Sequence, residues 1–203
     1  MARRRFIFDP PERFVAGTIG EPGDRTFFLQ ARDGARIVSI VLEKVQVAVL
    51  AERLGDLLDE LDRRGGTEGA EGESTPAEAA GTAAFASITA ELPGDVAPLD
   101  EPLNEAFRAG SLTLGWDVDA ERVLVEARAQ DEDGEPIDPA DDDDEDEDGP
   151  DLLRVRLTAD AARAFVARAS RVVAAGRLPC PLCGAPLDPS GHICPRRNGH
   201  FLN

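Results

Sequence analysis

The chain has 203 residues, of which 42% are apolar, and a net charge of −18 at pH 7. This apolar content is sufficient for a hydrophobic core and excludes a chain that is disordered throughout. No stretch approaches 18 apolar residues, and the apolar run before Asp9 is too short for a secretory leader. Three cysteines, an odd number, favour a reducing compartment. We therefore expect a soluble cytoplasmic protein with no membrane partner.

The negative charge is concentrated in two low-complexity segments. Residues 131–151 contain 14 acidic residues and residues 65–81 contain four, with no basic residue in either. Together they equal the whole net charge, so the remainder of the chain is neutral. We interpret both as solvated connections, because like charges repel and stay extended. A docking segment for a basic partner, or weak calcium binding, remains an alternative, although the run "DDDDEDED" lacks the glycine and ligand spacing of a calcium loop.

The first half of the chain predicts three strands and a helix. Residues 13–19, 25–31 and 35–43 are short runs rich in Phe, Val and Ile, and Asp-Gly at 33–34 is a hairpin signal between the last two. Residues 44–64 carry leucine and valine at helical spacing with charged residues on the other side. These features indicate a small antiparallel sheet followed by an amphipathic helix.

The second half repeats this order. Residues 111–118, 122–129 and 152–157 alternate or cluster apolar side chains as strands do, and the acidic segment connects the last two. A helix is predicted over residues 158–176, with Thr158 as its N-cap and glycine at its end. The repeated order suggests an internal duplication of a strand-strand-strand-helix unit.

Each predicted sheet has one apolar face and each predicted helix one apolar stripe. Burying these against each other gives a two-layer α+β domain. We expect this domain to cover residues 1–176, with a single antiparallel or mixed sheet of about six strands and both helices on one face. The low-complexity segments 65–81 and 131–151 belong to it as insertions, and residues 177–203 form a separate zinc-binding tail.

All the cysteines and histidines of the chain lie in this tail. The stretch "CPLCG" separates Cys180 from Cys183 by two residues, as in a zinc knuckle, where glycine relieves the tight turn. In "GHIC", His192 and Cys194 are two residues apart, which places both side chains on one side of an extended backbone. These four residues predict a Cys₃His site for Zn²⁺. His200 is the alternative fourth ligand, less favoured because it lies near the chain terminus.

Other roles for these cysteines remain open. A redox pair would need a helix amino terminus to depress the pKa of one thiol, whereas here proline and glycine place the pair in a loop. Unligated surface thiols are a further alternative. Four soft ligands leave no open position for a substrate, so the expected zinc is structural. Metal binding would also supply the folding free energy of a tail that has almost no core.

Three stretches carry a resemblance to a known family. These are "RRFIFDPPERFVAGTIGEPGDRTFFLQA" at 4–31, "EAFRAGSLTLGWD" at 105–117 and "CPLCGAPLDPSGHICPRRNG" at 180–199. They resemble an uncharacterised actinobacterial family, domain of unknown function 3090, over nearly the whole chain outside the two low-complexity segments. The resemblance implies a bacterial cytoplasmic protein, and it implies no particular reaction.

The function that fits these features is protein interaction through a zinc-stabilised module, with a protein partner of unknown identity. A zinc-ribbon nucleic-acid binder is the first alternative, since Arg177, Arg196 and Arg197 flank the predicted site. Three arginines are few, because affinity for nucleic acid grows with the number of phosphates neutralised. Two anionic segments further argue against a nucleic-acid partner.

An enzyme that uses carboxylates of the body is the second alternative. Its candidates are Asp9, Glu12 and Asp117, but Asp9 precedes two prolines and is more simply part of a turn, and Asp117 more simply opens a hairpin. The chain has no GxSxG, GxxxxGK[ST] or GxGxxG motif and no histidine outside the tail. We therefore predict no catalytic residue and no cofactor other than zinc.

Overall fold

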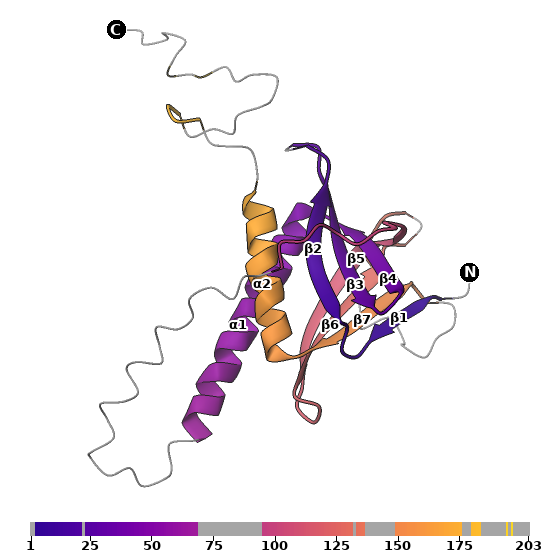
Figure 1. Cartoon of the computed structure of the whole chain (residues 1–203), viewed down its shortest axis with the longest axis vertical. Helices are drawn as coiled ribbons and strands as arrows, with labels where there is room; N and C mark the ends of the chain where they lie inside the picture. The colour runs from indigo at the N-terminus through magenta and orange to yellow at the C-terminus, as the bar shows by residue number, and fades with distance from the viewer. Residues whose placement is uncertain are drawn as a thin grey trace.

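The computed structural model describes residues 3–21, 23–68, 95–131, 133–136, 149–175, 180–183, 194 and 196. Within these residues the chain forms one seven-stranded sheet with two helices packed on one side of it (Figure 1). This confirms the predicted two-layer α+β fold. Neither of the two helices is long and apolar enough to span a membrane, in the part of the chain that the structure describes.

Three strands and a helix occur twice in chain order, as the sequence predicts. The elements are β1 (Arg5–Phe8), β2 (Arg13–Ile19), β3 (Thr26–Asp33), β4 (Arg36–Leu42), α1 (Lys44–Glu68), β5 (Glu105–Asp117), β6 (Arg122–Ala129), β7 (Leu152–Leu157) and α2 (Ala159–Ala174). Strand β1 is the addition to the six predicted runs. It is short, because Asp9 and Pro10 follow it and proline cannot donate to a strand ladder.

The sheet is mixed, with strand order β1-β7-β6-β5-β4-β3-β2. Strands β2 to β4 form one antiparallel meander and β5 to β7 form another. The two meanders join through the parallel pair β4 and β5, and β1 adds in parallel to β7. A parallel pair needs a long crossover, which α1 and the residues after it supply.

The core lies between the sheet and the helices. Phe14 of β2 stacks on Phe165 of α2 with ring centroids 4.9 Å apart, and Leu54 of α1 is fully buried in the same cluster. Helix α2 follows the second meander, yet among the strands it packs mainly on β2 of the first, while α1 follows the first meander and contacts α2 and β5 of the second half. Each repeat therefore depends on the other for burial of its apolar face, and the two form one cooperative unit.

Helix α2 has defined ends. The hydroxyl of Thr158 accepts a hydrogen bond from the backbone N–H of Ala161, which confirms the predicted N-cap. At the other end, Arg25 from the loop before β3 donates to the carbonyl of Ala175. Such a contact satisfies one of the carbonyls that a helix leaves free at its C-terminus.

Residues 95–103 cover the face of β2 and β3 that lies opposite the helices. Gly17 is on this face, and a Cβ placed on it would meet the side chain of Leu99 at 2.7 Å. The buried side chain of Gln30 donates to the carbonyl of Asp100 (2.9 Å) and accepts from its backbone N–H (2.8 Å). These two hydrogen bonds resemble those between neighbouring strands, and they hold residues 95–103 against the sheet. Strands β2, β3 and β4 are therefore buried on both faces.

Part of each expected low-complexity segment is ordered in the structure. Helix α1 continues to Glu68, so the first four residues of segment 65–81 are helical, and residues 69–81 lie outside the described residues. Once a helix is formed, each further residue adds a backbone hydrogen bond at little cost, which is why it continues beyond its apolar stripe.

Both ends of segment 131–151 are also ordered. The carboxylate of Asp131 accepts the backbone N–H groups of Asp133 (2.9 Å) and Glu135 (2.8 Å). Asp151 accepts the backbone N–H of Arg4 at 2.8 Å and pairs with its guanidinium, which fixes the start of β7 beside β1. The central residues 137–148 lie outside the part of the chain that the structure describes.

Candidate metal centre

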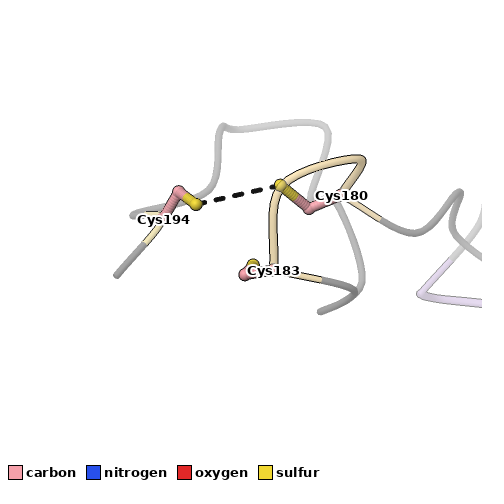
Figure 2. A group of neighbouring side chains, drawn as sticks. All are labelled: Cys180, Cys183 and Cys194. Atoms are coloured by element: carbon pink, nitrogen blue, oxygen red, sulfur yellow. Dashed lines mark hydrogen bonds between the residues drawn. The ribbon is translucent and has the colours of Figure 1, made fainter. Parts of the chain in front are cut away.

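The structure brings the three cysteines together. The sulfur atoms of Cys180, Cys183 and Cys194 all lie within 4.8 Å of one another, and these three cysteines form no disulfide with one another. Figure 2 shows the sulfur atoms of Cys180 and Cys194 facing each other. These two atoms lie 3.9 Å apart. Two of these cysteines lie in one turn, and the third lies eleven residues further along the chain.

The sulfur spacing fits a tetrahedral metal ion. Zinc–thiolate bonds of about 2.3 Å at tetrahedral angles separate two sulfur atoms by about 3.8 Å. The distance of 3.9 Å between Cys180 and Cys194 is close to this value. A disulfide would require about 2.05 Å. The cluster therefore has the dimensions of a thiolate metal site.

The turn at 180–183 favours the thiolate form of its first cysteine. Backbone hydrogen bonds from Cys183 and then Leu182 lower the pKa of the Cys180 thiol to about 6, against the opposing effect of burial. The side chains of Cys180 and Cys194 are buried and that of Cys183 is half-buried. Because the thiolate is the form that binds a metal, this turn is prepared for ligation.

Arg196 donates a hydrogen bond to the turn formed by residues 180–183. Its Nη1 donates to the carbonyl of Leu182 over 2.9 Å, which links the residues after Cys194 to the turn that holds Cys180 and Cys183. Arg196 is exposed, as the sequence predicts, but part of its hydrogen-bonding capacity is used within the site.

The predicted fourth ligand lies outside the part of the chain that the structure describes. His192 and His200 lie outside the described residues, as do Arg177 and Arg197. Within the residues that are described, the metal-ligating cluster consists of the three cysteines. The choice of His192 as the fourth ligand stays a prediction.

The candidate carboxylates of the body are engaged in ion pairs. Asp9 and Asp117 both approach Arg156 of β7, at 3.1 and 3.6 Å, and Glu12 lies 3.5 Å from Arg32 of β3. Asp117 also accepts the backbone N–H of Ala120 in the β5–β6 turn. These contacts give each carboxylate a role in fixing strands and turns.

Sequence reasoning missed a network of charged residues at the edge of the sheet. Arg13 of β2 pairs with Asp95 and Asp100, and Arg168 of α2 pairs with Asp95 at 2.9 Å. Arg168 is only 6% exposed and lies within the apolar stripe of α2, three residues after Phe165. A charged residue inside an apolar stripe was the one signal that could have revealed it.

Comparison with known families places the chain. The family described as "Protein of unknown function (DUF3090)" has a model that matches residues 6–194. The chain belongs to this family. The match includes all three clustered cysteines and His192, whereas His200 lies beyond it. No curated protein and no solved structure matches the chain.

Proposed function

We propose that this DUF3090 protein is a cytoplasmic zinc-binding protein whose C-terminal segment, residues 177–203, serves as a protein-interaction module. The observation that carries the proposal is the approach of three cysteine sulfur atoms to within 4.8 Å of one another. Thiolate-rich tetrahedral sites select zinc over the hard cations magnesium and calcium. His192, two residues before Cys194, completes a Cys₃His set, and its place inside the family match supports it over His200.

The zinc in this proposal is structural. Three thiolates and one imidazole fill a tetrahedral shell and leave no position for a substrate or an activated water. Binding of the metal is then the main source of stability for the tail, since the site assembles only when the ligands are brought together.

Leu182 supports a protein partner over nucleic acid. It lies between Cys180 and Cys183 and is 49% exposed, so the turn that holds the metal also presents a large apolar side chain to solvent. Apolar side chains on a rigid support are typical of protein interfaces, whereas nucleic-acid affinity depends on free cationic groups. The guanidinium of Arg196 donates a hydrogen bond to the turn itself, so it is not wholly available to a phosphate.

Metal analysis of the purified full chain tests the zinc site. We expect one zinc per chain, complete loss in Cys183→Ser, and strong loss in His192→Ala. His200→Ala is the matched control and should retain the metal. The assignment would be refuted by a folded wild-type protein, prepared under reducing conditions, that contains less than about a tenth of an equivalent of zinc per chain. Structural zinc sites bind the metal too tightly for a purification buffer to remove it.

The interaction role has a separate test. Leu182→Ser leaves every proposed ligand in place, so it should retain zinc and lose a partner recovered from the native cell, whereas Cys183→Ser should lose both. If Leu182→Ser keeps the partner, the apolar turn is not the contact. Binding to DNA or RNA that falls steeply with salt would favour the nucleic-acid alternative.

A further inference from the structure

A cavity lies on the body, separate from the cysteines. It has a volume of about 360 Å³ and is enclosed by β2, α2 and residues 95–103. Its walls are apolar at Leu99, Leu103 and Val172, and Arg168 supplies a guanidinium. The volume is at the lower end of the range for small-molecule sites, about 300–1,000 Å³.

Two of the three guanidinium nitrogen atoms of Arg168 donate hydrogen bonds within the body. Its Nε donates to the carbonyl of Ala16 (2.7 Å), and its Nη1 donates to the carbonyl (2.7 Å) and the carboxylate (2.9 Å) of Asp95. Among the residues that the structure describes, none accepts a hydrogen bond from Nη2. Nη2 is not buried without a partner, so solvent reaches it, and it can donate to an anionic oxygen that enters the cavity.

Two exposed apolar side chains also line the cavity. Ile19 and Val96 both line it, and their side chains are 53% and 82% exposed. Ile19 ends the edge strand β2, and no further strand lies beside it in the part of the chain that the structure describes. An occupant with an aliphatic part would remove this apolar surface from water.

The surrounding charges restrict the occupant further. Arg13 is already engaged by Asp95 and Asp100, so it adds little attraction for a second anion. Glu101, which is exposed, also lines the cavity and repels additional negative charge. A singly charged carboxylate is therefore a better match than a phosphate ester, whose charge is near −2 at neutral pH.

We propose that this cavity binds a small aliphatic monocarboxylate. Its carboxylate accepts the free Nη2 donor of Arg168, and its hydrocarbon part packs on Leu99 and Val172 and under Val96. The site does not depend on the proposed zinc site, since every residue named belongs to the body.

Titration of the full chain with 4-methylpentanoate, followed by NMR, tests the site. We expect saturable shifts in the backbone signals of Gly17, Val96 and Leu99. The neutral amide of the same acid, 4-methylpentanamide, should bind at least about tenfold more weakly, because a hydrogen bond to an ionised partner is stronger than a neutral one. Equal affinity of acid and amide, or no saturable shift up to about 50 mM, a limit far above an ordinary site affinity, would overturn the proposal.

Variants at exposed positions avoid loss of the fold. Arg168 fixes both Asp95 and β2, so its removal would weaken the body as well as the site. Val96→Asp instead places a negative charge beside the cavity and should weaken carboxylate binding about fivefold or more. Glu101→Gln removes a negative charge there and should strengthen carboxylate binding by about twofold.

The matched control is Val118→Asp. Val118 is 73% exposed in the β5–β6 turn and does not line the cavity. The Val118→Asp substitution should leave the affinity for 4-methylpentanoate unchanged. Equal weakening by Val118→Asp and Val96→Asp would show an effect of net charge alone and would overturn the assignment of this cavity.

Discussion

The body and the C-terminal cysteine cluster obtain their order from different interactions. In the body, the sheet and two helices bury phenylalanine, leucine, isoleucine and valine in one continuous cluster. In the cysteine cluster, the buried side chains are Cys180 and Cys194, and the contacts include the proximity of the sulfur atoms, backbone hydrogen bonds to the Cys180 thiol and one hydrogen bond from Arg196. We therefore expect the body to be stable without a metal, and the proposed metal to offset the entropy of ordering the chain in the cysteine cluster.

The largest loss of stability is expected from Phe165→Ala. Phe165 is 1% exposed and joins α2 to β2 through its stacking on Phe14. Removing it should lower the free energy of unfolding of the body by about 3–5 kcal/mol. Urea denaturation followed by circular dichroism measures this loss. Val49→Ala on α1, where the side chain is 46% exposed, is the control and should change stability by less than about 0.5 kcal/mol.

Cys180→Ser should produce the opposite pattern. We expect the zinc affinity to fall by more than about a hundredfold, since even residues that only support ligands cost 10–100-fold. The urea midpoint of the body should stay unchanged, because Cys180 is absent from the body's hydrophobic cluster. If the body loses more than about 2 kcal/mol, a typical effect of a core substitution, the cluster and the body form a single cooperative unit.

The same contrast explains what the sequence could predict. The strands and helices follow from local periodicity, so six of the seven strands that the structure describes and both helices overlap the predicted ranges, although β5 begins at Glu105, six residues before its predicted start. The cysteine turn is also local, because CxxC spacing is nearly sufficient to bring two thiols to one point. Both features depend on residues that are neighbours in the chain.

Contacts between distant segments were beyond the sequence. Gln30 meets Asp100, and Arg168 meets both Ala16 and Asp95, across separations of 70 to 152 residues. No local pattern in residues 95–103 indicates that they cover β2 and β3, since the segment has no period of either helix or strand. The cavity beside Arg168 depends on this cover, so the sequence offered no sign of it.

A smaller effect is expected at Asp95, where the body holds its covering segment by charge. Hydrogen bonding from Arg13 is the main reason why the pKa of Asp95 lies below its ordinary value. The ionised carboxylate therefore stabilises the fold above the unfolded-state pKa of about 3.9, and this contribution is lost as the pH falls through the lowered folded-state pKa. Asp95→Asn should cost about 1–2 kcal/mol at neutral pH.

Urea denaturation of wild type and Asp95→Asn at a series of pH values measures this dependence. The difference between the two proteins should shrink below about pH 4. Asp119→Asn, in the β5–β6 turn, controls for the loss of one negative charge. A difference that stays constant down to acid pH would mean that the charge of Asp95 does not contribute.

The smallest effect is expected from Arg196→Ala, and it separates two roles of this residue. The hydrogen bond from Arg196 to the carbonyl of Leu182 links the two ends of the cysteine cluster across an exposed surface. Such a bond contributes about 0.5–1.5 kcal/mol, so zinc should bind about two- to tenfold more weakly while the body is unaffected. Competition with a chelator of known affinity measures the change. Arg196→Lys retains the charge but lacks the extended planar fork, so it should restore little of the affinity. Full restoration by lysine would show that Arg196 acts on the thiolates by its charge and not by closing the turn.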